Sequence, residues 1–340
     1  MQAVILVGGE GTRLRPLTSS TPKQMLPIMG IPMLEGVLLQ LARHGIDEAI
    51  LSLGYLPDRF IEAYPNGECA GVKLRYAVEP EPLDTAGAVR FAAQELGAEE
   101  TFVVVNGDVL TDLDVSALVA FHRERGAEGT IALHPVDDPS RFGVVPTDAN
   151  GRVIAFVEKP PIEEAPTNLI NAGTYVFEPS VLERIGLGER ISIERVTFPA
   201  LVADGSLYAM ADESYWLDTG TPEAYLQAHY DILEGRRSPS FLNVNLENGS
   251  LILKGAELDP HASIHTSVIG QGARVEEGAV IERSVLLEGA HIKRGARVEG
   301  SIVGANASVG VNSVLGPTSV VGFGVAVEDG VELHDARVGE

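Results

Sequence analysis

A six-residue repetition in the C-terminal part of the chain constrains the fold more than any other feature. From about residue 250, small apolar residues return mostly every six residues, with three steps of five and small residues between them. This pattern is typical of a parallel β-helix whose triangular coils stack three units per turn. An antiparallel β-domain would need alternating patterns and hairpin turns, which are not found here. The expected stack positions are Leu258, Ile264, Ile269, Val275, Ile281, Leu287, Ile292, Val298, Val303, Val309, Leu315, Val321, Val327 and Leu333.

The preceding residues follow a different pattern, in which short apolar runs alternate with amphipathic stretches. AVILV is followed by MLEGVLLQLARHG, EAILSLG, GAVRFAAQELG and TFVVVNGDV. This order predicts alternating strands and helices, and hence an α/β fold with a doubly wound, mostly parallel, Rossmann-like sheet. The polar run EGRRSPS then reads as a linker. We predict a first domain over residues 1–235, a linker over 236–250 and a left-handed parallel β-helix over 251–340.

The charge balance and the single cysteine limit the partners and the compartment. The 340 residues include 25 Lys and Arg against 48 Asp and Glu, which gives a net charge of −23. Such a surface repels nucleic acid and anionic membranes, so a phosphate site must be a local basic patch. Cys69 alone cannot form an internal disulfide, and no signal peptide or membrane span is evident. We expect a cytoplasmic protein that binds neither nucleic acid nor membrane.

The stretch VILVGGEGTRLRPLTSSTPKQMLPI combines a glycine-rich loop with cations. It matches neither the P-loop pattern nor the dinucleotide-binding fingerprint. Glycines after a buried strand leave room for several backbone N–H groups to approach an anion. Cations beside such a loop suit a chain of phosphates better than one carboxylate. The glycines are Gly8, Gly9 and Gly11, and the cations are Arg13, Arg15 and Lys23.

An aspartate follows another predicted strand. Asp108 comes after the apolar run FVVVNG, and sites in doubly wound sheets lie beyond the carboxyl ends of the strands. We therefore expect Arg13, Lys23 and Asp108 to face one cleft. Asp108 could instead cap a helix or turn, and we interpret the nearby Asp112 and Asp114 as loop or cap residues.

The motifs together identify a family. The text GGEGTRLRPLTSSTPKQMLPI resembles the signature of the sugar-1-phosphate nucleotidyltransferases, or NDP-sugar pyrophosphorylases. NGDVL, FGVV, VEKP, NAGTYVF and WLDTGTP follow in the order of the family, and several members carry a trailing hexapeptide β-helix. The resemblance covers essentially the whole chain. It implies transfer of a nucleoside monophosphate from an NTP to a sugar 1-phosphate, with Mg²⁺ as cofactor and release of pyrophosphate.

The resemblance also implies roles for individual residues. Arg13 would hold the β- and γ-phosphates, and Lys23 would contact the α-phosphate and the sugar phosphate. Asp108 and Asp218 would bind Mg²⁺, and Asp108 would be catalytic together with the two cations. The implied nucleotide-binding residues are Gly8, Gly9, Gly11, Thr12, Arg13, Glu79 and Gly87. The implied sugar-phosphate-binding residues are Gly143, Glu158, Lys159, Asn171 and Gly173.

The base and the sugar are read from one further stretch. VEPEPLDTAGAVRFA is similar to the EPLGTAG run of mannose-1-phosphate guanylyltransferases. Guanine offers adjacent N–H donors, which suit a carboxylate such as Glu79 or Glu81. Asp84 departs from this pattern, since glycine is usual there, and Gln24 is closer to thymidylyltransferases. We expect GTP and mannose 1-phosphate, with glucose-1-phosphate thymidylyl- or adenylyltransfer as the alternative.

Two functions from other classes are also open. The β-helix could be an acyltransferase module, because His261, His265 and His291 lie within it. The chain could also be a catalytically silent sensor of nucleotide sugars, although binding alone does not require the metal pair. We expect the β-helix to assemble the chain into a homo-oligomer.

Overall fold

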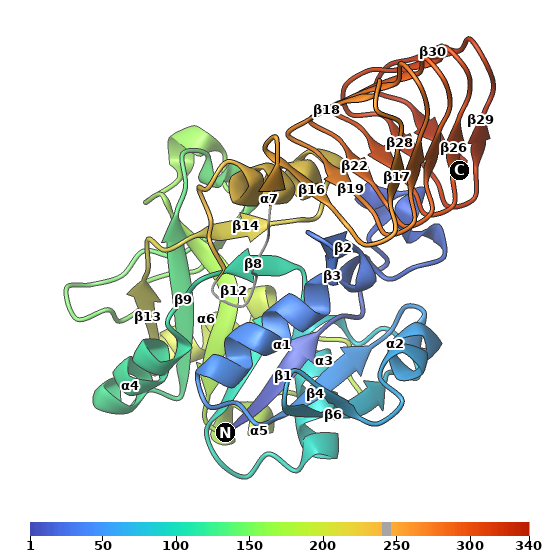
Figure 1. Cartoon of the computed structure of the whole chain (residues 1–340). Helices are drawn as coiled ribbons and strands as arrows, with labels where there is room; N and C mark the ends of the chain where they lie inside the picture. The colour runs from blue at the N-terminus through green and yellow to red at the C-terminus, as the bar shows by residue number, and fades with distance from the viewer. Residues whose placement is uncertain (240–245, 340) are drawn as a thin grey trace. The chain divides into compact units, whose positions relative to one another are not determined.

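The structure is a computed structural model that describes residues 1–239 and 246–339 (Figure 1). The residues form two compact units, each interrupted in sequence. Unit one combines Met1–Gly9 with Leu34–Trp216, and unit two combines Glu10–Met33 with Leu217–Glu340. These units do not coincide with the predicted domains, whose boundaries stay a prediction. Residues 240–245 of the predicted linker lie outside the described residues.

Unit one is built on a mixed sheet, and the predicted α/β class is confirmed. Its centre is the parallel run β6-β4-β1-β7, which places the ends of β1 and β7 side by side. The pairs β12-β7, β12-β9, β10-β12, β10-β11 and β5-β6 are antiparallel, and β13 is parallel to β9. The strands are β1 (Gln2–Leu6), β4 (Glu48–Leu53), β5 (Glu68–Cys69), β6 (Val72–Val78), β7 (Phe102–Asn106), β9 (Gly129–Pro135), β10 (Gly143–Val144), β11 (Val157–Glu158), β12 (Leu169–Phe177) and β13 (Leu207–Ala211).

The helices of this part of the chain begin and end at residues with the expected chemistry. The side chain of Asp114 accepts a hydrogen bond of 2.9 Å from the N–H of Ala117, so Asp114 is the predicted helix cap. Gly97 and Gly126 end α3 and α4 in the left-handed region that glycine adopts without steric cost. The helices are α1 (Met33–Arg43), α2 (Pro57–Ala63), α3 (Asp84–Leu96), α4 (Val115–Arg125), α5 (Ser180–Glu183) and α6 (Phe198–Ala203), the last preceded by a π-helical turn at Ile193–Thr197.

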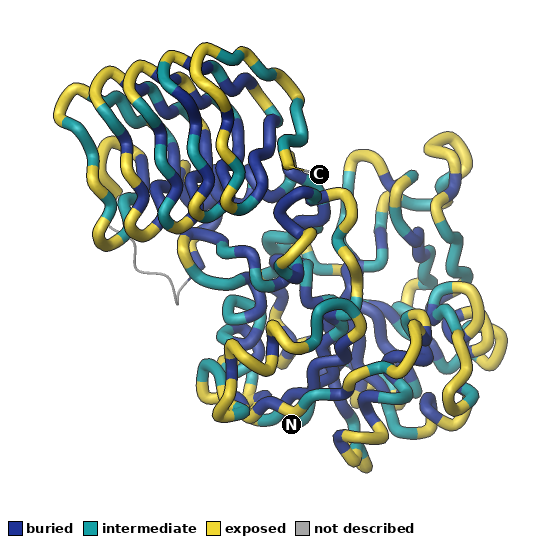
Figure 2. Tube along the Cα trace, turned by 90° about the vertical axis from the view of Figure 1, so that its right-hand side faces the viewer, coloured by how far each residue is buried: buried dark blue, intermediate teal, exposed yellow. Residues whose placement is uncertain are grey.

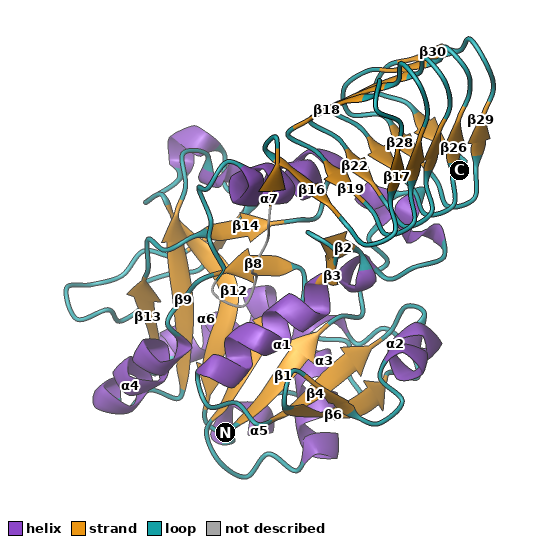
Figure 3. Cartoon of the chain, viewed as in Figure 1, coloured by secondary structure: helices purple, strands orange, loops and turns teal. Residues whose placement is uncertain are grey.

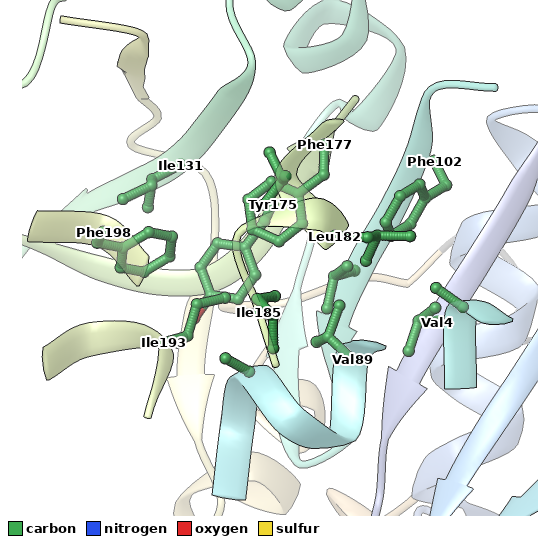
Figure 4. Close-up of a cluster of buried hydrophobic side chains, with 14 of the residues drawn as sticks. Val4, Val89, Phe102, Ile131, Tyr175, Phe177, Leu182, Ile185, Ile193 and Phe198 are labelled. Atoms are coloured by element: carbon green, nitrogen blue, oxygen red, sulfur yellow. The ribbon is translucent and has the colours of Figure 1, made fainter. Parts of the chain in front are cut away.

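The core of unit one lies between the sheet and the helices α3, α5 and α6 (Figure 4). Tyr175 and Phe177 from β12 pack against Phe198 of α6, with ring centroids 5.3 and 6.4 Å apart. Phe102 of β7 meets Phe177 edge to face. Rings packed in this way fix the position of β12, whose other end carries part of the candidate site.

Unit two starts with the loop that carries the N-terminal signature. This loop contains short 3₁₀ turns at Thr12–Leu14, Leu17–Ser19 and Lys23–Met25, and then the hairpin of β2 (Pro27–Ile28) and β3 (Ile31–Pro32). The unit continues from Leu217 into α7 (Pro222–Leu233), which is capped by Thr221. Of the remaining elements before the β-helix, β8 (Val109–Thr111) lies in unit one, and β14 (Trp216–Asp218) begins in unit one and ends in unit two.

The C-terminal residues form a β-helix, as the hexapeptide pattern predicted (Figure 3). Within the described residues it has three sheets, and every strand pair is parallel except β15-β16. The first sheet holds β15 (Leu246–Glu247), β16 (Ser250–Ile252), β19 (Val268–Ile269), β22 (Val285–Leu286), β25 (Ile302–Val303), β28 (Val320–Val321) and β31 (Arg337–Val338). The second holds β17 (Glu257–Leu258), β20 (Arg274–Val275), β23 (His291–Ile292), β26 (Ser308–Val309) and β29 (Ala326–Val327). The third holds β18 (Ser263–His265), β21 (Val280–Glu282), β24 (Arg297–Glu299), β27 (Val314–Leu315) and β30 (Glu332–Leu333).

One predicted stack position is wrong. Leu286, not Leu287, lies in the interior stack with Ile269 and Val303. Leu287 is also buried, but it is on the opposite face of the strand because successive side chains alternate. The handedness of the β-helix stays a prediction.

A column of buried serines explains the five-residue steps. The hydroxyl oxygens of Ser250, Ser267 and Ser284 each accept a hydrogen bond of 3.0–3.1 Å from the backbone N–H of the serine one coil later. The residues before these serines take left-handed backbone angles, for example φ 44° at Thr266 and 45° at Arg283. Each short step is therefore a tight corner whose inner N–H is satisfied by a side chain.

Candidate active site

The first half of the glycine loop lies in unit one, at the end of β1. A Cβ atom on Gly8 would lie 3.2 Å from the backbone nitrogen of Gly54 and 3.5 Å from Oε1 of Glu79. Gly9 is exposed. The missing side chain at residue 8 therefore allows a close approach of two backbone segments, and Gly9 leaves the loop open to solvent.

The second half of the loop lies in unit two and folds back on itself. Gly11 has φ 62°, and the hydroxyl of Thr18 donates a hydrogen bond of 2.8 Å to its carbonyl oxygen. A Cβ atom on Gly11 would lie 3.2 Å from Cβ of Lys23. The aliphatic part of Lys23 is thus packed over Gly11, while Thr12 is exposed. This arrangement needs glycine at residue 11 both for its backbone angle and for the space above it.

Arg13 lies beside Asp218 in unit two. Nη2 of Arg13 is 3.9 Å from Oδ2 of Asp218, and their side chains are 62% and 30% exposed. The N–H of Gly220 donates to Oδ1 of Asp218 at 2.9 Å, and a Cβ atom on Gly220 would lie 2.4 Å from Nη2 of Arg13. The glycine of WLDTGTP therefore makes room for the guanidinium and orients the carboxylate. Arg15 instead pairs with Glu10 at 3.1 Å.

Asp108 follows β7 in unit one and is half-buried. Gly107 precedes it, and its N–H donates to the carbonyl oxygen of Leu6 at 3.0 Å, which ties the loop to the end of β1. A side chain at Gly107 would clash with Val7, since its Cβ atom would lie 2.6 Å from Cγ1. The sequence NGD thus projects Asp108 from the carboxyl edge of the parallel strands, where ligands of such sheets bind.

Tyr175 of β12 is buried next to the predicted residue Asn171. Burial raises the pKa of this phenol well above its usual range, and the negative charges of Glu194, Glu158 and Asp108 act in the same direction. The phenol oxygen accepts a hydrogen bond of 2.9 Å from Nδ2 of Asn171. Tyr175 therefore stays protonated, and its hydroxyl oxygen holds the amide of Asn171.

The motif NAG forms a bulge in β12. The register between β12 and β9 shifts between Asn171 and Tyr175, and Gly173 has φ 75°. The N–H of Gly173 donates to Oδ1 of Asn171 at 3.0 Å, so both ends of the Asn171 amide are held. A Cβ atom on Gly173 would lie 2.7 Å from Nδ2 of Asn106. Bulges re-aim side chains, and this one fixes Asn171 next to the loop that leads to Asp108.

Glu158 and Lys159 are adjacent at the end of β11. Nζ of Lys159 lies 3.1 Å from Oε1 of Glu158, and the lysine side chain is 62% exposed. Lys159 has φ 49°, an uncommon angle for a residue with a Cβ atom. Gly143 faces Glu158 across the strand pair, and a Cβ atom there would lie 2.4 Å from the ring of Phe156. Strained backbone of this kind persists only where the surrounding structure holds it, and it is common at active sites.

The loop before α3 holds the residues predicted to read the base. Glu79 accepts from the hydroxyl of Ser52 at 2.9 Å through Oε1 and from the N–H of Leu83 at 3.1 Å through Oε2. Glu81 is exposed. Asp84 has φ 60°, and its Oδ1 accepts a hydrogen bond of 2.8 Å from the N–H of Thr85. Asp84 therefore adopts the backbone conformation that glycine favours, and Glu79 keeps the loop closed.

Gly87 has a packing role in the structure. Its N–H donates to the carbonyl oxygen of Ile191 at 3.2 Å, and its Cβ atom would lie 2.4 Å from the carbonyl oxygen of Glu189. The segment before the π-helical turn therefore lies directly on the first turn of α3. The nucleotide-binding role of Gly87 stays a prediction beside this observed contact.

Some residues of the site were not predicted. Trp216 donates from Nε1 to the carbonyl oxygen of Ala172 at 2.9 Å and stacks on His134, with ring centroids 5.5 Å apart. Thr85 donates to Glu194 at 2.9 Å and accepts from the N–H of Ile193 at 2.8 Å. Trp216 is the first residue of the motif WLDTGTP, so the motif could have indicated a role for it. No local pattern signals the contact of Thr85 with Glu194, because its partners are 109 residues apart.

The structure thus brings the predicted residues together in two groups. In unit one, Asn171 and Gly173 lie beside Asn106, two residues before Asp108, and Gly143 pairs with Glu158; in unit two, Arg13 lies beside Asp218 and Gly11 beside Lys23. The meeting of the two groups in one cleft stays a prediction. In the part of the chain that the structure describes, no three His, Cys, Asp or Glu side chains form a metal-binding cluster.

Folds with an α/β sheet bind ligands at the carboxyl ends of their strands, and a glycine-rich loop with cations suits an anion. The nucleotidyl transferase family model matches residues 2–235, and the model of the GMPPB C-terminal domain matches residues 246–339. The chain belongs to the nucleotidyl transferase family, and the predicted resemblance is confirmed.

Relatives with known names are similar over most of the chain. A mannose-1-phosphate guanylyltransferase of Mycobacterium tuberculosis is 41% identical, over 79% of this chain and 79% of the relative. The mannose-1-phosphate guanylyltransferase catalytic subunit beta of Dictyostelium discoideum is 41% identical, over 66% of this chain and 63% of the relative. The mannose-1-phosphate guanyltransferase of Aspergillus oryzae is 43% identical, over 66% of this chain and 62% of the relative.

Solved structures also resemble the chain. HddC from Yersinia pseudotuberculosis is 32% identical, with a TM-score of 0.58 over 67% of this chain and 97% of that one. The same protein has been solved in complex with GMP-PN. Among the helices of residues 1–239 and 246–339, none has the length and apolar character needed to cross a bilayer.

Proposed function

We propose that the chain transfers GMP from GTP to mannose 1-phosphate, which forms GDP-mannose and releases pyrophosphate. The observation that carries this proposal is the identity of 41–43% to relatives named for this activity, joined to a C-terminal match with the GMPPB domain. The chain spans less than two thirds of two of these relatives.

The reaction needs little proton chemistry from the protein. An oxygen of the sugar phosphate attacks the α-phosphorus, and the bond from that phosphorus to the β-phosphate oxygen breaks with its electron pair. The second pKa of a phosphate monoester is about 6, so the nucleophile is already ionised at neutral pH. The main tasks are to align two polyanions and to stabilise the leaving pyrophosphate. We assign the β- and γ-phosphates to Arg13 and the α-phosphate to Lys23, with backbone N–H groups of Gly8, Gly9, Gly11 and Thr12 beside them.

Asp108 and Asp218 are the proposed Mg²⁺ ligands. Both offer carboxylate oxygens, which Mg²⁺ prefers, and both side chains are partly accessible. Mg²⁺ takes few carboxylates and keeps waters and phosphate oxygens in its other positions, so two aspartates would suffice. When bound, the ion supplies positive charge to the triphosphate and to the leaving group.

The sugar phosphate is assigned to residues of unit one. Glu158 and the held amide of Asn171 offer partners for sugar hydroxyls, and Lys159 offers a cation for the phosphate. The missing side chains of Gly143 and Gly173 allow the substrate to approach the backbone. We assign the guanine N–H donors to Glu79 and Glu81, where Glu79 has already two protein partners and Glu81 is exposed.

A substrate panel tests the proposal. We would measure pyrophosphate release with GTP, ATP, UTP and dTTP, each with mannose 1-phosphate and glucose 1-phosphate, in the presence of Mg²⁺. The expected preferred pair is GTP with mannose 1-phosphate. A preference for dTTP with glucose 1-phosphate would favour the reading from Gln24. If no pair releases pyrophosphate, the hypothesis of a catalytically silent sensor of nucleotide sugars remains. Turnover of acetyl-CoA would instead indicate an acyltransferase.

The structure offers little support for the acyltransferase. His261 lies 3.2 Å from Asp259, His265 lies 3.2 Å from Ser263, and His291 lies 2.7 Å from Glu276. Each imidazole therefore has a neighbour on the outer surface of the β-helix. We further propose that the chain is a cytoplasmic homo-oligomer, which its nucleotide substrates and single cysteine support. Light scattering of the full chain tests the assembly, and a mass of one chain would contradict it.

A further inference from the structure

The outward surface of the first β-helix sheet is apolar and buried. Leu251, Val268, Val285, Ile302 and Val320 point away from the interior stack, yet none is more than 5% exposed. Outward positions of the second sheet are instead exposed, as at Arg274 and Ala326. Figure 2 shows buried residues in dark blue and exposed residues in yellow along the coils of the β-helix. An apolar outer face needs a cover, and residues of unit two supply part of it.

The signature loop contacts this face at two places. A Cβ atom on Gly322, which follows β28, would lie 3.2 Å from Cβ of Pro16 and 3.3 Å from its Cγ. At the other end of the loop, Cδ1 of Leu253 lies 2.7 Å from where a Cβ atom on Gly30 would be. The loop between these contacts carries Lys23. The β-helix therefore touches the loop on both sides of Lys23 and directly after Arg15.

The helix α7 contacts the same side of the β-helix. The hydroxyl of Tyr230 donates to the carbonyl oxygen of Arg283, whose guanidinium carbon lies 4.1 Å from the centre of the tyrosine ring. Nη1 of Arg283 also donates to Glu234 at 2.6 Å. Asp218, which pairs with Arg13, lies just before α7. The β-helix therefore also contacts the helix that follows Asp218.

We propose that the β-helix positions the phosphate-binding loop, with Gly322 and Leu253 as positioning residues. This proposal rests on the proposed function for its catalytic consequence. Neither residue touches the substrate in this account, and both act through the backbone of residues 10–33. The β-helix is then part of the machinery that places Arg13 and Lys23 and not only a module for assembly. A displacement of about 1 Å in reacting groups can lower a rate by about a hundredfold.

The first experiment replaces the glycine that meets Pro16. In Gly322→Leu, the first side-chain atom already lies at the limit of contact and the remaining carbons must displace Pro16. We expect kcat/KM for GTP to fall tenfold or more and KM for GTP to rise. KM for mannose 1-phosphate should rise less than KM for GTP, because Lys23 is the only residue of the loop that is assigned to the sugar phosphate, while the other proposed residues lie in unit one. Ala326→Leu adds the same side chain at an exposed position of the same coil and should change neither value.

The second experiment removes a contact and cannot overpack the fold. Leu253→Ala withdraws the side chain that lies against Gly30, and Leu246→Ala is its control at a position 38% exposed. We expect KM for GTP to rise selectively in Leu253→Ala, as in Gly322→Leu, but by a smaller factor. In the same variants, hydrogen exchange should speed up at the amides of Leu14 and Leu26, which close the turns of the loop.

Hydrogen exchange needs no substrate, so it separates this proposal from the proposed function. The parent chain could show no nucleotidyl transfer while the loop amides lose protection in Gly322→Leu. That result would contradict the proposed function but support the proposal that the β-helix positions the loop. Unchanged protection in both Gly322→Leu and Leu253→Ala would overturn the positioning. Equal rises in KM for both substrates would also overturn it, because that result indicates general damage to the fold.

Discussion

Asp84 occupies a position where its side chain and its backbone make opposite demands. Its φ of 60° is the left-handed region, which costs an ordinary L-residue about 1–2 kcal/mol and an aspartate less. Asp84→Gly removes this cost, but it adds about 0.5–1 kcal/mol of chain entropy to the unfolded state. It also removes a carboxylate from the first turn of α3, worth about 0.3–1 kcal/mol. The net change in the free energy of unfolding should therefore lie within about 1 kcal/mol of zero.

The same geometry predicts the kinetic result. The Asp84 carboxylate accepts from the N–H of Thr85, and the backbone already has the conformation that glycine would take. Asp84→Gly should therefore keep kcat/KM for GTP within about threefold of the parent, which is less than 1 kcal/mol, and should keep the order of the four NTPs. Asp84→Ala keeps the Cβ atom without the local hydrogen bond, so it should lose about 1–2 kcal/mol of stability.

The assay is kcat/KM for GTP, ATP, UTP and dTTP with mannose 1-phosphate, beside urea unfolding of the parent and both variants. A fall of more than tenfold for GTP alone in Asp84→Gly would refute the reasoning, since it would mean that the carboxylate contacts the base. Equal stability of Asp84→Ala and Asp84→Gly would refute the account of the backbone.

Other predictions concern the metal, the β-helix and pH. Asp108→Asn and Asp218→Asn each keep the side-chain volume but remove one negative charge from the proposed Mg²⁺ site, so pyrophosphate release should fall by about a hundredfold or more with little change in Tm; near-normal turnover in both would remove the metal assignment. Ser284→Ala deprives a buried N–H of its acceptor and should lower the free energy of unfolding by about 1–3 kcal/mol in urea; a loss below about 0.5 kcal/mol would contradict the serine column. Burial lowers the pKa of His229 to about 4, below the value of about 6.5 in the unfolded chain, so protons bind the unfolded state first as pH falls. Between pH 7 and 4 the parent should lose about 3 kcal/mol more stability than His229→Gln, and equal losses would remove this role.

The repeat predicted the β-helix, but it could not decide which of two neighbouring leucines faces inward. Leu286 and Leu287 are both apolar because both faces of the first sheet are buried. Periodicity identifies the inward face of a strand only when the other face is exposed to solvent. It cannot identify the inward residue where other residues cover the outer face as well. The serine before each of these strands was the better marker, since Ser267 and Ser284 precede Val-Ile and Val-Leu at the same point of the coil.

The fold of unit one was predicted in class but not in pairing. The apolar runs identified β1, β4 and β7, whereas nothing local shows that β12 runs antiparallel to β7. In the site, the types of residue were predictable because phosphate and Mg²⁺ require cations and carboxylates. The contact of Arg13 with Asp218 was not predictable from spacing, since it joins distant segments. Gly87 shows a different limit of sequence analysis. A glycine that is needed for packing cannot be distinguished in the sequence from a glycine that is needed for a ligand.

The make-up of unit two has a consequence for the order in which the protein matures. Residues 10–33 leave the ribosome early, but Leu253 and Gly322, which they contact, are synthesised more than 200 residues later. At about 5–20 residues per second, the loop waits on the order of 10–60 s for these partners. The strands of unit one can pair during this interval, while the phosphate-binding loop cannot take its final form. A nascent chain therefore completes its loop only when its last coils are made.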